Sequence, residues 1–310
     1  MSDIIKKQVN EILVNNNLDF RIEKIPLVGK QVVGSAISSN GELVDDVKLI
    51  HSPYFGLLNT KSGEMINTVK EGYTVSQNDE IIELVLRGIE PFGDKLVVNK
   101  AGSLNGGRKV FIQLAIEGVS HVGSDTIRRY VTIVDSNDGS TGLSIGIGDL
   151  TMSCANQFWK FYKSGQSKMR HTASLERRIL EIPSLITNAL EDSMQLVKTY
   201  NKLVGVSVSD NDIHRMVNEV VGISRLSSTG VIADASGKAI NAMEKVYEMI
   251  RVEMAQKGRN VWGLHSGVTR WTTHDKVAPK RSNGRIESAM IGTNYITNQK
   301  SLAFAMELAR

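Results

Sequence analysis

The chain has 310 residues, of which 41% are hydrophobic and 23% charged, and its formal net charge is +4. These proportions are typical of a globular protein, and no apolar run reaches the roughly 20 residues that a membrane helix requires. The single cysteine excludes an internal disulfide, and Lys6 and Lys7 interrupt any secretory signal near the N-terminus, so we expect a cytoplasmic protein.

Residues 1–153 are predicted to form a mainly antiparallel β region behind an N-terminal helix. Apolar residues recur at helical spacing between Ile4 and Leu13, which predicts the helix. From about Phe20 the sequence forms short apolar segments that end at turn signals, and residues 79–88 have the apolar spacing of a short helix. Short turns between successive strands favour antiparallel pairing.

Two of these turns predict hairpins. Residues 105–107 read Asn-Gly-Gly and residues 137–139 read Asn-Asp-Gly, and both glycine and asparagine tolerate the positive φ angles of tight turns. The second hairpin leads into a strand that runs as far as Cys154. We interpret this point as the junction between the sheet and the helical part of the chain.

Residues 154–310 are predicted to be mainly helical and to pack on the sheet as one composite domain. Apolar residues at helical spacing indicate a long helix over residues 175–203, broken near Pro183. Two further helices are expected to end at Gly222 and Gly258. Strands followed by helices give the predicted fold class, α+β, with a largely antiparallel N-terminal half and a helical C-terminal half.

Positive charge is concentrated in two short stretches. Residues 151–180 hold six basic and one acidic side chain, and residues 255–285 hold seven basic and one acidic. The tryptophans Trp159, Trp262 and Trp271 all fall inside these stretches. Focused charge with aromatic residues is typical of a polyanion-binding surface, although two solvated basic loops would give the same pattern.

The segment NVWGLHSGVTRWTTHD is predicted to form a helix whose two tryptophans face opposite ways. At 100° per residue Trp271 shares the apolar face, whereas Trp262 lies on the other side beside Arg259 and Arg270. An exposed tryptophan between cations is an arrangement that stacks a base of single-stranded nucleic acid. The alternative is that Trp262 packs against another domain, another subunit or the basic loop.

The candidate nucleic-acid-binding residues are therefore the cations of the two stretches together with one histidine and one tryptophan. They are Lys160, Lys163, Lys168, Arg170, His171, Arg177, Arg178, Arg259, Trp262, Arg270, Lys276, Lys280, Arg281 and Arg285.

The sequence contains no recognisable catalytic or metal-binding constellation. Its glycine-rich segments lack the Gly-Lys-Ser/Thr ending of a phosphate-binding loop, and its histidines form no zinc motif. Cys154 is better explained as a small buried thiol than as a nucleophile, because no base is placed near it by the sequence. We predict no catalytic residue, no cofactor and no metal.

Five segments in order resemble the phage- and plasmid-related proteins catalogued as domain of unknown function 932. They are AGSLNGGRKVFIQLAI, GSDTIRRYVTIVDSNDGS, CANQFW, RHTAS and NVWGLHSGVTRWTTHD, and the resemblance extends over about residues 45–295. The matching residues are Cys154, Asn156, Arg170, His171, Thr172, Trp262, Val268 and Thr269. The sequence departs from the family pattern at Asn137, where the family has histidine, at Thr151, and at Gln157 and Phe158.

The resemblance implies a protein of a mobile element that acts around DNA in the cytoplasm of a bacterial host. Our leading hypothesis is a non-enzymatic, homo-oligomeric protein that binds or anneals single-stranded DNA, with no membrane partner. One alternative is a metal-dependent nuclease or DNA-modifying enzyme that uses scattered acids such as Asp135, Asp138 and Asp149. Another is an interaction protein that binds a host factor.

Overall fold

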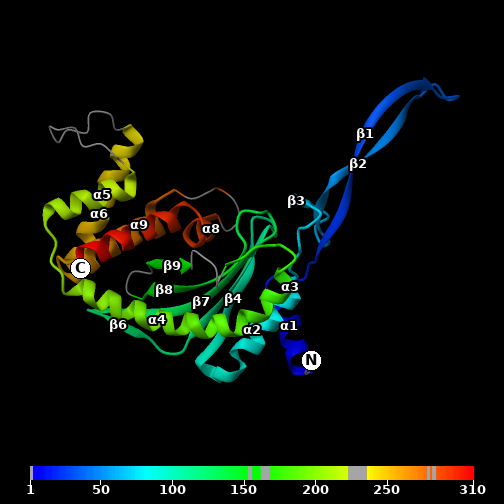
Figure 1. The fold of residues 1–310 in the computed structure, drawn as a ribbon. Helices are drawn as coiled ribbons and strands as arrows, with labels where there is room; N and C mark the ends of the chain where they lie inside the picture. Colours follow the sequence, from blue (N-terminus) through cyan, green and yellow to red (C-terminus); the bar gives the residue numbers. More distant parts are fainter. Residues whose placement is uncertain (1–2, 153–155, 162–167, 223–235, 278–279, 281–283) are drawn as a thin grey trace.

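The computed structural model describes residues 3–310 with the exception of 153–155, 162–167, 223–235, 278–279 and 281–283. The fold is α+β, with antiparallel sheets in the N-terminal half and most helices in the C-terminal half, as predicted (Figure 1). No helix in the described part of the chain has both the length and the apolar content needed to cross a bilayer.

Most strands of the described chain precede most of its helices. The strands are β1 (Ile22–Ile37), β2 (Leu43–Asn59), β3 (Met65–Lys70), β4 (Leu96–Leu104), β5 (Lys109–Ile116), β6 (Ser120–Val122), β7 (Asp125–Ser136), β8 (Leu143–Thr151), β9 (Gln157–Phe161) and β10 (Lys168–Met169). The α-helices are α1 (Asp3–Asn15), α2 (Asn78–Ile89), α3 (Leu175–Arg178), α4 (Ile182–Val204), α5 (Asp210–Val221), α6 (Gly237–Lys257), α7 (Val261–Arg270), α8 (Gly284–Met290) and α9 (Thr293–Leu308). Two 3₁₀ helices, η1 (Glu90–Lys95) and η2 (Ile179–Glu181), and a π-helical turn, η3 (Trp271–Asp275), complete the set.

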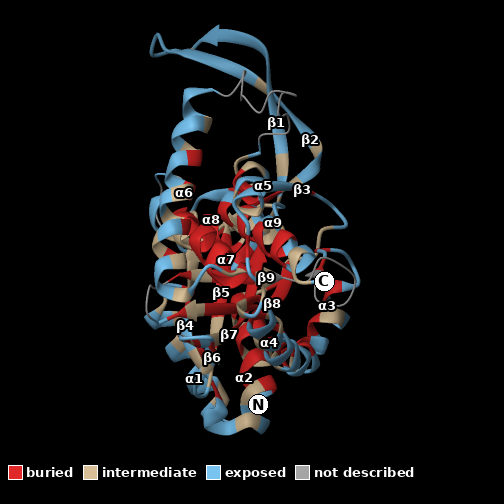
Figure 2. Ribbon diagram, turned by 90° about the vertical axis from the view of Figure 1, so that its left-hand side faces the viewer, coloured by how far each residue is buried: buried red, intermediate tan, exposed pale blue. Residues whose placement is uncertain are grey.

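Strands β1 and β2 form a long hairpin, called the arm below, that projects from the rest of the molecule (Figure 1). Strand β3 pairs only with the lower part of β2, between Tyr54 and Leu58. Both faces of the arm are exposed beyond this point, as the pale blue ribbon in Figure 2 shows. The part of the arm beyond β3 therefore adds nothing to the core, whereas Ile22 and Leu57 at its base belong to the core.

The second sheet has seven strands and forms the centre of the molecule. Its path runs β10-β8-β7-β5-β4, with β9 paired to β8 and β6 paired to β7. Asn105, Gly106 and Gly107 all have positive φ angles in the β4–β5 turn, which confirms that predicted hairpin. Because β9 and β10 follow residue 153, the change from strands to helices comes later than expected.

Different helices cover the two faces of the seven-stranded sheet. Neighbouring residues of a strand point to opposite faces, so they show which helices lie on each face. Phe158 belongs to the larger core, which also includes Ile186 of α4. Trp159, the next residue, belongs to a smaller core with Phe111 and with Met290 of α8. The sheet therefore lies between α2 and α4 on one side and α8 on the other, while α9 contributes Leu302, Phe304 and Ala305 to the larger core.

The helix boundaries in the second half agree with the sequence signals. The long helix is interrupted at η2, and Pro183 lies in the first turn of α4, where its missing N–H costs no hydrogen bond. Ser209 caps α5 by accepting from the Asp212 amide, and Gly222 ends the helix with φ +83°. The predicted end of α6 at Gly258 is also confirmed.

Candidate functional site

Trp262 is buried, which contradicts the predicted exposed position. Residues 261–269 of α7 are buried on every side, since the helix packs against α4, α6 and α9. Gly267 allows α6 to approach closely, because a Cβ at this position would stand 2.4 Å from the Ile250 Cα. A helix surrounded in this way has no solvent face to identify from the sequence. The core position predicted for Trp271 is confirmed by its 4% exposure.

Trp262 belongs to a buried network that we call the Trp262 cluster, made of Asp125, Glu253, Lys257, Trp262 and Arg270. The indole Nε1 donates to Asp125 at 2.8 Å, and the Lys257 ammonium lies 2.6 Å from the same carboxylate. Lys257 is also 2.8 Å from Glu253, which in turn pairs with Arg270 at 3.0 Å. Two carboxylates thus balance two cations, and Arg270, whose side chain is 30% exposed, is paired with Glu253.

An aromatic group extends this network to the central sheet. Trp262 and Tyr200 have ring centroids 4.8 Å apart, and the Tyr200 hydroxyl donates to Asp149 at 3.0 Å. Burial raises the pKa of Asp149 to about 7, against the opposing effects of the Tyr200 hydrogen bond and the Arg129 charge. Burial, followed by the Lys257 charge, lowers the pKa of His265 to about 3. The group is therefore a packed interior with a carboxyl that resists ionisation.

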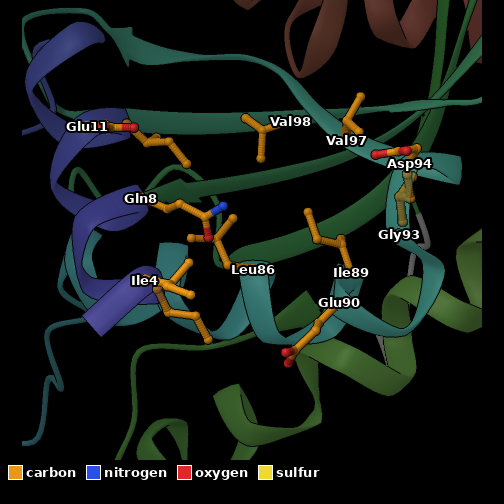
Figure 3. A pocket seen from close by; sticks show the side chains of 13 residues that line it. Ile4, Gln8, Glu11, Leu86, Ile89, Glu90, Gly93, Asp94, Val97 and Val98 are labelled. Atoms are coloured by element: carbon orange, nitrogen blue, oxygen red, sulfur yellow. The ribbon is translucent and has the colours of Figure 1, made fainter. Parts of the chain in front are cut away.

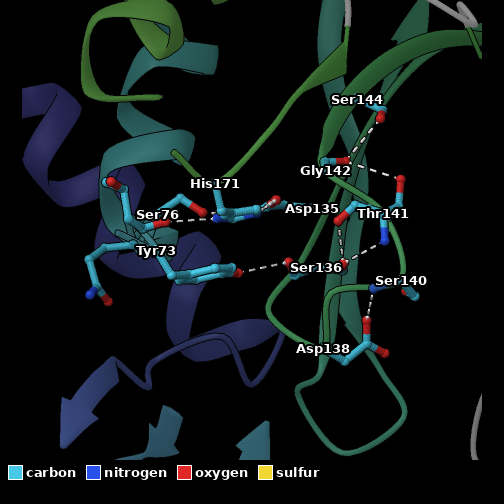
Figure 4. A network of polar contacts seen from close by, with 12 residues as sticks. Tyr73, Ser76, Asp135, Ser136, Asp138, Ser140, Thr141, Gly142, Ser144 and His171 are labelled. Carbon is cyan, nitrogen blue, oxygen red and sulfur yellow. Dashed lines mark hydrogen bonds and ion pairs between the residues drawn. The ribbon is translucent and has the colours of Figure 1, made fainter. Parts of the chain in front are cut away.

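A second network, the His171 clamp, consists of Tyr73, Thr74, Ser76, Asp135 and His171 (Figure 4). The His171 ring stacks on Tyr73 with centroids 4.8 Å apart and an interplanar angle of 2°. Its Nε2 lies 2.9 Å from Asp135 Oδ1, and its Nδ1 lies 3.0 Å from the Thr74 carbonyl oxygen. Ser76 donates to the other Asp135 oxygen. The clamp thereby joins the segment after β3 to the end of β7.

The geometry of the clamp makes His171 a cation. The Thr74 carbonyl can only accept, so Nδ1 carries a proton, and Nε2 faces the Asp135 carboxylate and carries the other. Burial alone would lower the pKa of His171, but the hydrogen bond and charge of Asp135 outweigh burial, and the pKa is raised. Neither nitrogen is left to act as a base, and Ser76 bonds to Asp135 and not to His171. The clamp is not a Ser–His nucleophilic pair.

The turn between β7 and β8 lies beside the clamp (Figure 4). Ser136 and Thr141 bond to each other across it, with Ser136 Oγ donating at 2.6 Å. Asp138 lies 3.1 Å from the buried ammonium of Lys109, which also lies 2.5 Å from Glu287 of α8. These ion pairs hold the turn against α8 on the sheet's second face.

The sequence contains a signal for both networks. Asp125 begins β7, Asp135 lies near its end and Asp149 lies in the apolar strand β8, and all three side chains are buried. Buried carboxylates need partners, so each acid in such a strand predicts a polar network. In contrast, nothing local identifies Lys257 or Ser76 as the partners.

Some of the predicted cations have partners within the protein or are partly buried. Arg259 is exposed and donates to Asp210 at 2.7 Å. Arg178 is half-buried. Lys276 is half-buried with its ammonium 4.9 Å from the centroid of Trp271, and burial, followed by the Lys300 charge, lowers its pKa to about 8.

The other candidates are either exposed or lie outside the described residues. Arg170, Arg177, Lys280 and Arg285 are exposed, and Lys160 is half-buried on β9. Lys163, Arg281 and Cys154 lie outside the described residues, and only the backbone of Lys168 is described.

The two basic stretches meet at β9. The Gln157 amide donates to Thr273 Oγ1 at 3.2 Å, although the two residues are 116 positions apart in the sequence. Arg285 Nη1 donates to the carbonyls of Thr273 and His274, at 2.7 and 3.2 Å, so its exposed guanidinium is held close to this contact. Lys160 lies on the same strand, one residue before its end at Phe161.

A groove of about 480 Å³ lies between α1, the end of α2 and strand β4 (Figure 3). Its walls are mainly aliphatic, and the exposed carboxylates of Glu11, Glu90 and Asp94 border it. Strand β4 is an edge of the seven-stranded sheet, so the groove also adjoins unpaired backbone. Such a groove suits an apolar segment that carries positive charge.

The described residues contain no group of three or more His, Cys, Asp or Glu side chains placed to hold a metal ion. A family model described as domain of unknown function 932 matches residues 65–291, which is most of the chain. No curated protein and no solved structure matches the sequence. Both the His171 clamp and the Trp262 cluster lie within the matched region.

Proposed function

The chain belongs to the family catalogued as domain of unknown function 932, and from this premise we propose that it binds single-stranded DNA. The protein acts as a binding or annealing factor of a bacteriophage or related mobile element, in the cytoplasm of the bacterial host. The observation that carries this proposal is the meeting of the two basic stretches at β9. This contact places β9, which carries Lys160 of the first stretch, beside the segment to which Arg285 of the second stretch is bonded.

The cations that remain available suit contact with phosphates. Arg170, Arg177 and Arg285 are exposed, and Arg285 is held in place by two backbone carbonyls. A guanidinium that is already ordered loses little side-chain entropy when it binds a phosphate. Such contacts position a strand without reading its sequence, so we expect affinity for single strands of any sequence to depend on salt.

The test is a salt series of binding to a labelled single-stranded oligonucleotide, followed by fluorescence anisotropy. We test a triple variant, Arg170→Ala, Arg177→Ala, Arg285→Ala. The slope of log affinity against log salt concentration should decrease in magnitude by about 2, since each single-strand phosphate contact contributes about 0.7 to it. Affinity should be lower for a duplex of the same length.

The matched control removes three exposed cations from α6, as Lys238→Ala, Lys245→Ala, Arg251→Ala. It lowers the net charge by the same amount and should leave the salt slope unchanged. Equal slopes for both triple variants would show that only net charge matters. A wild-type protein that does not bind at low salt would refute the proposal.

The same proposal includes self-assembly through the arm. The β1–β2 register places six aliphatic side chains on one face, five of them between 49% and 75% exposed. They are Val28, Val32, Ile37, Leu43, Val47 and Leu49. The same face also carries Lys30, His51 and the hydrogen-bonded pair Ser35 and Asp45. Exposed aliphatic side chains grouped in this way mark a contact with another protein.

We assign that contact to the groove of Figure 3 on a second copy of the chain, because the charges are complementary. Lys30 lies on the apolar face of the arm, paired with Leu49, and the groove is bordered by Glu11, Glu90 and Asp94. The arm and the groove are different surfaces, so repetition of this contact produces rings, filaments or an arm-exchanged dimer.

Light scattering coupled to size-exclusion chromatography tests this assembly. The wild type should be larger than a monomer, and Lys30→Glu should shift it toward the monomer by placing a carboxylate among those of the groove. Lys48→Glu, on the opposite face of the arm, is the control and should leave the size unchanged. A monomeric wild type would refute the assembly without affecting DNA binding.

A further inference from the structure

A small cavity lies on the face of the seven-stranded sheet that α8 covers. Its volume is about 210 Å³, and its lining comes from strands β4, β5, β7, β8 and β9 and from α8. Pockets for drug-sized ligands occupy about 300–1,000 Å³, so this cavity suits a single ring system. Aromatic and polar side chains line it together, including Phe111, Tyr130 and Trp159.

Trp159 brings an unused hydrogen-bond donor to this cavity. Its side chain is only 6% exposed, yet its Nε1 has no hydrogen-bond partner. A Cβ on Gly148, its neighbour on β8, would stand 2.8 Å from the indole Cδ1 and 2.9 Å from Nε1. The N–H edge of the ring therefore extends over Gly148 toward Tyr130, which pairs with Gly148 on β7.

The absence of a side chain at Gly148 is what allows this position of the indole. A buried N–H without an acceptor is destabilising, because it has lost its hydrogen bonds to water. The core residue Trp262 shows the usual solution, because its Nε1 donates to Asp125. The contrast indicates that Trp159 receives its acceptor from a ligand.

The other polar groups of the cavity are several donors and the carboxyl of Asp149, which accepts from Tyr200. Lys100 is exposed beside it, and Gln113 accepts from Asn99 Nδ2 at 2.9 Å through its carbonyl oxygen, which leaves the Gln113 amide N–H groups available. Tyr130 adds a hydroxyl and an aromatic ring. Donors around flat apolar walls select a planar ring that carries carbonyl oxygens.

We infer that the cavity binds one pyrimidine base with two carbonyl acceptors, thymine or uracil, from a single strand. The inference rests on the proposed function, because it supplies a base contact beside the phosphate contacts of the β9 region. Trp159 Nε1 and Lys100 donate to the carbonyl oxygens, and the rings of Phe111 and Tyr130 provide the apolar surface.

The experiment compares the affinities of an oligothymidine and an abasic oligonucleotide of the same length for the full chain. The wild type should prefer oligothymidine, and Trp159→Phe, which keeps the ring and removes the N–H, should reduce that preference about fivefold. Lys100→Met should reduce it similarly and keeps the fold intact because Lys100 is exposed. Trp262→Phe also removes an indole N–H, but outside the cavity, and should leave the preference unchanged.

Free thymidine separates this inference from the proposed function. In saturation-transfer NMR the nucleoside should bind the wild type and should bind Trp159→Phe more weakly, whether or not oligonucleotides bind. Oligonucleotide binding with equal affinities for the thymidine and abasic strands would overturn the cavity and leave DNA binding standing. Thymidine binding without oligonucleotide binding would support the cavity and refute the proposed function.

Discussion

The Trp262 cluster and the His171 clamp are built on the two ends of one strand, yet they connect different parts of the molecule. Asp125 begins β7 and pairs with Lys257 of α6, whereas Asp135, near the end of β7, pairs with His171. The first network connects helices to the sheet inside the core. The second joins the segment that follows the arm to the end of the sheet.

The cation of the clamp determines how that network responds to pH. A histidine can lose its proton near neutrality, and the pKa of His171 is raised because the hydrogen bond and charge of Asp135 outweigh burial. We therefore expect the base of the arm to loosen as pH rises through the folded-state pKa of His171.

Lys257→Met should have the largest effect on stability. The substitution keeps the apolar stem but leaves the buried carboxylates of Asp125 and Glu253 without their ammonium, which costs about 3–5 kcal/mol. Urea unfolding measures the loss. Lys245→Met, at an exposed position of the same helix, should change stability by less than about 0.5 kcal/mol. A similar loss in both variants would contradict the buried role of Lys257.

Asp149→Asn should stabilise the protein at neutral pH. Because the folded-state pKa of Asp149 is raised to about 7, the wild type loses stability as pH rises from about 4 to 7, and the amide does not. The difference in free energy of unfolding between the variant and the wild type should grow to the order of 2–4 kcal/mol over this interval and then remain constant. Asp192→Asn, at an exposed position of α4, is the control. Parallel stability curves for Asp149→Asn and wild type would exclude the raised pKa.

His171→Phe should give a smaller loss that depends on pH. The ring can still stack on Tyr73, but Asp135 loses a charged hydrogen-bond donor, at a cost of about 2 kcal/mol. Because the pKa of His171 is raised, its contribution is complete below its usual value of about 6.5 and is lost as pH rises through the folded-state pKa. Unfolding at pH 6 and pH 9 measures this change, with exposed His121→Phe as the control. If His171→Phe loses as much free energy of unfolding at pH 9 as at pH 6, His171 is not charged.

Arg170→Ala should have the smallest effect on stability, although Arg170 is adjacent to His171. Its side chain is exposed, so unfolding should change by less than about 0.5 kcal/mol. The salt slope of single-strand binding should decrease by about 0.7 if the guanidinium contacts one phosphate. A large loss of stability would mean that Arg170 belongs to the clamp.

Much of the fold could be predicted because its signals are local. The Asn-Gly-Gly turn, the Ser209 cap and the Gly222 stop each depend on a few neighbouring residues and appear where the sequence places them. Strand alternation and helix spacing likewise predicted the α+β class. Strands β9 and β10 were missed because they are short and follow the point where the apolar pattern changes.

The candidate site was predicted less well, because surface position is not a local property. His171 and Arg170 are neighbours in the sequence, but one is buried by Tyr73 and Asp135 and the other is exposed. Both were predicted to bind nucleic acid. The charge count also included Lys257, whose charge is balanced inside the core.

By itself the sequence determined which segments form strands and helices, where they end, and that two stretches are rich in positive charge. Only the tertiary structure decided which of those charges reach solvent and which aromatic rings are covered. Trp262 and Asp125 are 137 positions apart, and their hydrogen bond forms because α7 is enclosed on all sides. Periodicity describes one helix and one solvent face, so it cannot identify a side chain whose neighbours all come from distant elements.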